Sequence, residues 1–187
     1  MTSALRIVCF GSSRVVPTDP TWKLADAVGY EIGRRGLTVV SGGYGGAMGA
    51  VSEGGRRGGG QVYGVTTPIF TERQGNAHLH QEYQEPDYPS RLAALLRQGH
   101  GFVALPGALG TVSEWVTAWC LATIDQLGGP LWLFEDPWKP LAESMLRLPE
   151  SNPEHASQII WVSDAEDLGR KMDAWLEARP ARRAEEA

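Results

Sequence analysis

The sequence predicts a single α/β domain whose sheet is mostly parallel and carries helices on both faces. Three observations lead to this fold class. Apolar runs without alternation, the first at residues 5–10, are typical of strands that are buried on both faces. Segments with helical spacing follow these runs through short connections, as in a doubly wound sheet. The 23 glycines cluster mainly at residues 42–49, 54–60 and 107–110, as expected where backbone turns tightly or approaches a ligand.

Strand and helix alternate about six times along the chain. Gly36 and Asp164 suit the end of the first helix and the start of the last one. Residues 68–88 lack periodicity and predict a long loop, of a kind that often serves as a lid or binding loop. The predicted strands are residues 5–10, 37–40, 61–65, 102–105, 131–134 and 159–162, and the predicted helices are residues 21–35, 47–57, 89–98, 109–124, 140–147 and 164–178.

No linker or internal repeat divides the chain. We therefore expect residues 1–178 to form one Rossmann-like domain that binds a nucleotide or another phosphate ligand. Residues 179–187 are charged, and we expect them to form a flexible tail.

The composition argues against several classes of function. The formal net charge is −5 and no basic run is long enough to follow a polyanion, so nucleic acid is excluded as a partner. No apolar stretch reaches membrane-spanning length, and the N-terminal run is too short for a signal sequence. Cys9 and Cys120 lie in apolar segments, where we expect both to be core residues of a cytoplasmic protein.

Two further sets of residues have a structural and a functional interpretation. His78 and His80 could form a metal pair, but no third ligand stands at a recognisable spacing, so a solvated loop is favoured. The sequence thus predicts neither a metal nor an organic cofactor. Six of the seven tryptophans are expected to pack in the core or between subunits. They are Trp115, Trp119, Trp132, Trp138, Trp161 and Trp175.

Three predicted strand-to-helix turns are rich in glycine or serine. The carboxyl ends of parallel strands face one crevice, where backbone N–H groups and helix N-termini can hold phosphate without a net positive charge. One such turn is equally well explained by close packing of a helix on the sheet, but three together favour binding. The candidate binding residues are Gly11, Ser12 and Ser13, then Gly42, Gly43, Tyr44, Gly45, Gly46 and Met48, then Gly107, Ala108, Leu109, Gly110 and Thr111.

The third turn resembles a known signature. Residues 106–114 read P-G-A-L-G-T-V-S-E, which is similar to P-G-G-x-G-T-x-x-E of the Lonely Guy (LOG) family of cytokinin-activating phosphoribohydrolases, often labelled lysine decarboxylase-like. Residues 41–49 resemble that family's G-G-G-x-x-G-L-M-G segment, and the turn at residues 11–13 matches its first strand end. The resemblance spans residues 6–140.

An arginine precedes the signature proline by 15 residues in the family, and Arg91 stands at that offset. The surrounding stretch departs from the family's M-H-E-R-K at Pro89 and Leu92. Ala108 replaces a signature glycine.

Glu114 and Arg91 are the candidate catalytic residues. A carboxylate near a ribose can stabilise an oxocarbenium-like state or position water, and an arginine can clamp phosphate or ribose with two parallel hydrogen bonds. The alternatives are an ordinary acid near a helix N-terminus for Glu114 and a solvated helix face for Arg91. Thr111 offers a hydroxyl that could equally cap the helix. We expect Arg91 and Glu114 to approach one crevice with space for a sugar between them.

Three functions remain open. The resemblance implies an enzyme that cleaves a nucleoside 5'-monophosphate to its base and ribose 5-phosphate. The same fold could instead carry a phosphorylated ligand, such as a nucleotide or a molybdopterin-type cofactor, without cleaving it. The third possibility is a scaffold protein that binds no phosphate ligand and whose tryptophan-rich faces serve only assembly with other subunits. The resemblance also implies a homodimer or a larger homo-oligomer, with helices packed around the site.

Overall fold

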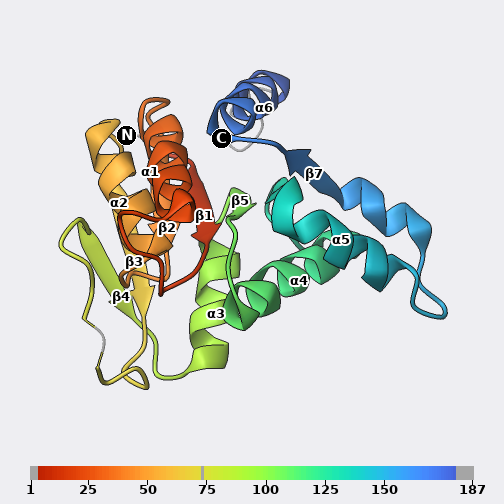
Figure 1. The fold of residues 1–187 in the computed structure, drawn as a ribbon, viewed down its shortest axis with the longest axis horizontal. Helices are drawn as coiled ribbons and strands as arrows, with labels where there is room; N and C mark the ends of the chain where they lie inside the picture. The colour runs from red at the N-terminus through yellow and green to blue at the C-terminus, as the bar shows by residue number, and fades with distance from the viewer. Residues whose placement is uncertain (1–3, 73, 180–187) are drawn as a thin grey trace, which may run out of the picture.

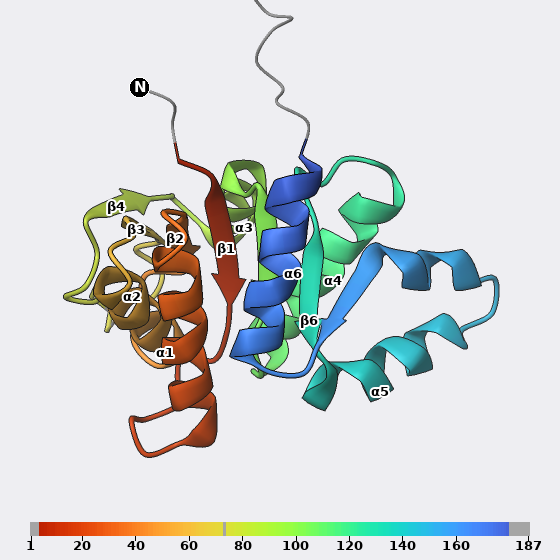
Figure 2. The same ribbon diagram turned by 90° about the horizontal axis from the view of Figure 1, so that it is seen from above.

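In the part of the chain that the structure describes, seven parallel strands form one sheet between two layers of helices (Figure 1). The structure is a computed structural model that describes residues 4–72 and 74–179, so nearly all of the predicted tail lies outside it. Helices α1, α2 and α6 lie on one face of the sheet, and α3 and α4 lie on the other (Figures 1 and 2). The predicted fold class is confirmed.

The predicted elements agree with the structure to within a few residues at most ends. The strands are β1 Arg6–Phe10, β2 Thr38–Ser41, β3 Val62–Thr66, β4 Gln81–Gln84, β5 Gly101–Ala104, β6 Leu131–Phe134 and β7 Ile159–Val162. The helices are α1 Pro20–Gly33, α2 Ala47–Arg57, α3 Tyr88–Gln98, α4 Leu109–Thr123, α5 Glu135–Leu146, the 3-10 helix η1 Pro153–Gln158 and α6 Ala165–Ala178.

Three details of the prediction were wrong. The segment predicted as one long loop contains β4, whose sequence QEYQ is polar and mostly exposed because the strand lies at the sheet edge. Helix α5 begins five residues earlier than predicted and contains Pro140. Helix α1 ends at Gly33, and Gly36, with φ of +69°, makes the turn toward β2. By contrast, Asp164 caps α6 as predicted, because its carboxylate accepts a hydrogen bond from the N–H of Asp167.

The strand order determines where a ligand can bind. The order is β4-β3-β2-β1-β5-β6-β7, so the chain builds outward from β1 on one side and then continues with β5 on its other side. Ile7 of β1 pairs with Val39 of β2 and with Gly101 of β5. The boundary between β1 and β5 is therefore a topological switch point, and open α/β sheets bind ligands beyond the carboxyl ends of the strands at such a point.

The glycines of α2 serve packing between helices. A Cβ atom on Gly54 would collide with the carbonyl oxygen of Asp26 in α1, and one on Gly29 of α1 would collide with the carbonyl of Val51 in α2. The two helices can approach this closely only because side chains are missing at the contact. These glycines are therefore needed for the packing of α1 against α2 and not for binding a ligand.

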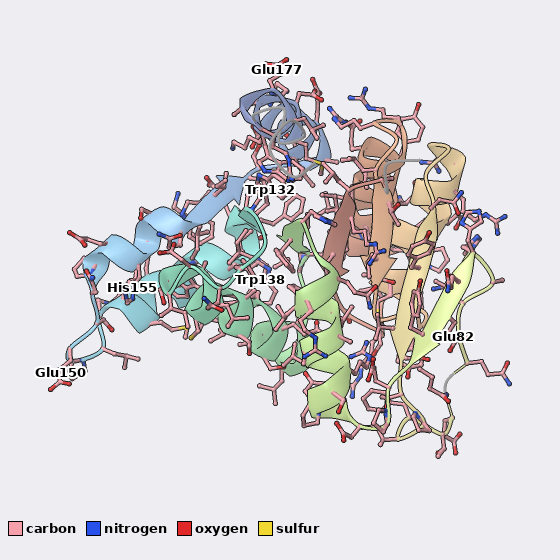
Figure 3. All side chains as sticks on the ribbon, turned by 180° about the vertical axis from the view of Figure 1, so that it is seen from behind. Glu82, Trp132, Trp138, Glu150, His155 and Glu177 are labelled. Carbon is pink, nitrogen blue, oxygen red and sulfur yellow. The ribbon has the colours of Figure 1, made fainter. Side chains whose placement is uncertain are left out.

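Tryptophans fill the core on the side of α4 and α5. Trp115 and Trp132 are fully buried, and Trp119 and Trp138 are nearly so, which confirms their predicted packing role. Figure 3 shows Trp132 and Trp138 inside the molecule and Glu82 of β4 at its rim. Trp161 and Trp175 are half-buried and pack against the same core.

The two cysteines differ in their environments. Cys9 is buried in β1 as predicted, whereas Cys120 is exposed on the outer side of α4, so its predicted place in the core was wrong. None of the helices within residues 4–72 and 74–179 combines the length and apolar character needed to cross a bilayer.

Candidate functional site

A cavity of about 460 Å³ opens at the switch point. The three turns predicted from the sequence meet there, since residues of each line its wall. The volume lies within the range of cavities that hold small-molecule ligands. The lining residues are Gly11, Ser12, Ser13, Arg14, Tyr44, Met48, Phe70, Tyr88, Arg91, Ala108, Leu109, Gly110, Thr111 and Glu114.

Three of these residues were not among the sequence-based candidates: Arg14, Phe70 and Tyr88. Arg14 directly follows the Ser-Ser turn, so its position gave a usable signal. Tyr88 lies three residues before Arg91 at the start of α3, one helical turn away. Phe70 lies in the aperiodic segment after β3, where spacing gives no guide to orientation.

Five of the candidate binding glycines do not line the cavity: Gly42, Gly43, Gly45, Gly46 and Gly107. Gly42 is required for a different reason, because a Cβ atom there would collide with the guanidinium of Arg91. Gly46 has φ of +67° and faces the backbone of Ser12 and Ser13. The glycines of the second turn therefore pack against the first turn and Arg91 on the side away from the cavity. Only Tyr44 and Met48 of this turn line the cavity itself.

Arg91 is buried and held by main-chain oxygens. Its side chain is only 5% exposed. Its Nε donates to the carbonyl of Val65 at 2.7 Å, and its Nη2 donates to the carbonyl of Gly42 at 3.2 Å. The guanidinium also lies over the ring of Tyr44, 5.6 Å from the ring centroid. The alternative of a solvated helix face is thus wrong.

Glu114 forms an ion pair with Arg91. Oε1 of Glu114 lies 3.6 Å from Nη1 of Arg91, and the carboxylate side chain is 10% exposed. Both residues line the cavity, as the sequence analysis expected. The expected space for a sugar between them is absent, because carbonyl contacts hold Arg91 directly against the carboxylate. A ligand must lie on top of the pair.

Burial raises the pKa of Glu114 to about 7, against the opposing effect of the Arg91 charge and hydrogen bond. Desolvation penalises the ionised carboxylate more than its single cation compensates. The group therefore exchanges its proton near neutral pH, as is common for functional carboxyls. Glu114 is not the solvated N-terminal acid of the alternative interpretation.

The raised pKa predicts how stability depends on pH. The folded state binds the Glu114 proton more tightly than the unfolded state, so this group stabilises the fold below pH 4.5, and the contribution is lost as the pH rises through about 7. Relative to Glu114→Gln, the free energy of unfolding should fall by up to ~3 kcal/mol across that interval. Urea unfolding of both proteins at a series of pH values measures this difference, and parallel curves would contradict it.

The segment after β3 is anchored to the second turn. The side-chain amide of Asn76 donates to the carbonyls of Gly43 and Tyr44, each at 3.1 Å, and the Asn76 N–H donates to Gly43 at 2.8 Å. The hydroxyl of Tyr44 bonds to the backbone of Thr67 at the start of the segment. Both ends of the segment are thus tied to the turn that carries Tyr44, and the ring of Phe70 between them packs edge-on against Tyr44.

Helix α4 begins at the cavity without a side-chain cap. Its N-cap residue is Ala108, which has no side-chain group to accept from the first backbone N–H groups. Thr111 lies within the first turn and lines the cavity, so it does not occupy the capping position. Helix N-termini with uncapped N–H groups favour anions. Trp138 holds the preceding end of β5 in place through bonds from Nε1 to the carbonyls of Ala104 and Leu105.

The histidines of the loop make structural contacts. Nδ1 of His80 accepts the N–H of Val62, and Nε2 of His78 lies 3.9 Å from a carboxylate oxygen of Glu53. Within the described part of the chain, no three His, Cys, Asp or Glu side chains gather in a way that could hold a metal ion.

Comparison with known proteins identifies the family. Residues 48–172 match the family model described as possible lysine decarboxylase, which covers more than half of the chain. The chain belongs to this family, the LOG family. The match includes Arg91, the whole third turn and Glu114.

Two relatives of this chain are named for the reaction that they catalyse. A cytokinin riboside 5'-monophosphate phosphoribohydrolase from Mycobacterium marinum is 36% identical over 106 residues, which are 55% of this chain and 57% of that protein. A pyrimidine/purine nucleotide 5'-monophosphate nucleosidase from Escherichia coli is 30% identical over 116 residues, covering 58% of this chain and 25% of that protein. The chain thus spans just over half the length of the first relative and a quarter of the second.

The fold is also shared with a solved structure, the molybdenum cofactor binding protein of Rippkaea orientalis. The TM-score is 0.74 at 19% identity, covering 94% of this chain and 99% of that one. At this identity the likeness concerns the fold alone.

Proposed function

We propose that this protein is a phosphoribohydrolase that cleaves a nucleoside 5'-monophosphate to its base and ribose 5-phosphate. One observation carries the proposal: a buried carboxyl with a pKa of about 7 lies beside a fixed guanidinium at a cavity lined by three strand-to-helix turns. Family membership and the names of the relatives support the same reaction class.

The chemistry assigned to Glu114 follows from its position. Water adds to C1' of the ribose while the bond from C1' to the base nitrogen breaks. The proton that the water gives up to Glu114 is passed on to the leaving base, so the base departs protonated and Glu114 returns to its ionised form. The Glu114 carboxylate accepts a proton from that water and stabilises the positive charge that develops on the sugar ring. Arg91 holds the carboxylate in place and favours its ionised form. We propose that the first and third turns bind the phosphate, with the uncapped start of α4 as one contributor.

The direct test is to incubate the purified protein with AMP and to detect adenine and ribose 5-phosphate by mass spectrometry. Release of both products in equal amounts supports the proposal. Retention of AMP without product would favour the carrier function on the same fold. Mass spectrometry of the ligand that remains bound after native purification would then identify what is carried.

We further propose that the protein is cytoplasmic and forms a homodimer or a larger homo-oligomer through α4. This helix and the residue that caps its end carry apolar side chains on the outer side as well as toward the core: Leu109 is 82% exposed and Ile124 is 62% exposed. The exposed Cys120 lies on the same side, and so do Val112 and Val116, which are half-buried and pack partly against the core. Such a face beside the cavity fits burial against a second copy. Light scattering at the 20.3 kDa mass of one chain would contradict this proposal.

A further inference from the structure

The charged side chains that line the cavity differ in how far protein contacts already occupy them. Among the described residues, three charged side chains line it: Arg14, Arg91 and Glu114. The guanidinium of Arg91 already faces two carbonyls, a tyrosine ring and the Glu114 carboxylate. When Glu114 is ionised, the charges of the pair cancel, and the remaining charge is that of Arg14.

Arg14 is exposed, and its side chain is uncommitted within residues 4–72 and 74–179, where no carboxylate lies within 4 Å of it and no side-chain hydrogen bond forms. Its guanidinium can therefore turn toward a ligand without breaking a protein contact. An arginine in this state is suited to a two-pronged contact with phosphate oxygens.

The backbone beneath Arg14 is fixed. Its N–H donates to Oγ of Ser12 at 3.1 Å, and the carbonyl of Ser12 accepts the N–H of Ala47 at the start of α2 at 2.8 Å. An exposed side chain without a hydrogen bond or ion pair to the described residues thus projects from a fixed turn at the edge of the cavity. The uncapped N-terminus of α4 lines the same cavity, so a phosphate there can meet both groups.

The replacements around Arg91 make this cation more important. The lysine and histidine positions of the family stretch hold Leu92 and Pro89, and neither residue lines the cavity. Leu92 packs against the hydrophobic core. With a chain net charge of −5, the overall field of the protein does not attract an anion, so the binding energy for a phosphate must come from local groups, of which Arg14 is the available cation.

We propose that Arg14 is the specificity-determining residue that makes this site select phosphorylated nucleosides over unphosphorylated ones. The inference rests on the proposed function for its substrate class. Beyond that function, we assign the positive charge that recognises the phosphate to Arg14 in the turn after β1, and not to the buried Arg91 of α3.

Calorimetric binding of AMP and adenosine tests this proposal, in a Glu114→Gln background so that AMP is not consumed. Arg14→Ala is expected to weaken AMP binding roughly 10- to 100-fold, the range for a lost charged hydrogen bond, and to change adenosine binding less than about twofold. Arg14→Lys should retain part of the preference. Raising the salt concentration should weaken AMP binding less in Arg14→Ala than in the parent.

Lys23→Ala is the matched control, because Lys23 is an exposed cation on the neighbouring helix α1 that does not line the cavity. It should leave both affinities unchanged. Arg14→Ala should keep the parent melting temperature, since the side chain makes no contact that the fold needs.

Equal losses for AMP and adenosine, or no loss for either, would overturn the role of Arg14 while leaving the hydrolase proposal intact. Arg14-dependent binding of AMP by a wild-type protein that does not cleave it would support the inference and overturn the proposed reaction. Failure of the parent to bind either compound would overturn both.

Discussion

Glu114→Gln is expected to lower the turnover of AMP by at least about a thousandfold, while AMP binding changes by less than about threefold. The substituted amide has nearly the same size and keeps an oxygen near Arg91, but it cannot accept a proton from water or oppose a positive charge on the sugar. Removal of the carboxylate therefore weakens binding of the transition state but not binding of AMP in the ground state. Initial rates of adenine release together with calorimetry separate the two.

The variant should remain folded, because it removes a buried charge that is costly to desolvate. Glu143→Gln, at an exposed position of α5, is the control for a general effect of removing an acid. Glu114→Asp tests position, because the carboxylate stays but withdraws by one methylene, so turnover should fall with little change in AMP affinity. Substantial turnover by Glu114→Gln would show that another group performs the proton transfer.

The arrangement of the site could be predicted from the sequence because it depends on strand ends. Parallel strands place their carboxyl ends together, so three glycine- or serine-rich turns after β1, β2 and β5 had to converge. Glu114 could be placed because it lies one turn into the helix that follows such an end. The strands β1 and β6 could also be predicted, because each is a continuous apolar run, and such a run indicates a strand that is buried on both faces.

Features that depend on contacts between distant segments could not be predicted. The strand β4 is polar because it lies at the edge, so its sequence carries no apolar pattern. Gly42 is conspicuous in the sequence as a binding glycine, yet its missing side chain admits Arg91 from a helix 49 residues away. The exposure of Cys120 likewise depends on which side of an apolar helix faces outward.

The fixed position of Arg91 has a consequence for stability. Sequence alone suggested a phosphate clamp whose loss weakens ligand binding. The structure shows a guanidinium whose partners are two carbonyls and a buried carboxylate, so its removal leaves three acceptors without their donor. Removal of one partner from a buried pair typically costs ~3–5 kcal/mol.

Arg91→Met, which keeps much of the side-chain volume, is therefore expected to destabilise the fold by about 3 kcal/mol at pH 8. Without the Arg91 charge, the pKa of Glu114 should rise further above its present value of about 7, since burial is then unopposed. At pH 5.5 the carboxyl is already protonated, so the same substitution should cost less. Any AMP turnover should also fall at neutral pH, because the carboxylate form becomes scarce.

A double-mutant cycle separates the pair from the carbonyl contacts. If Arg91 acts mainly by compensating Glu114, the variant carrying both Arg91→Met and Glu114→Gln should be more stable at pH 8 than the sum of the single effects predicts, by about 1 kcal/mol or more. At pH 5.5 this coupling should shrink, because the carboxyl of the single Arg91→Met variant is neutral there. Urea unfolding of the four proteins at both pH values measures the coupling. Strict additivity at pH 8 would mean that the carbonyls of Gly42 and Val65, and not Glu114, account for the burial of Arg91.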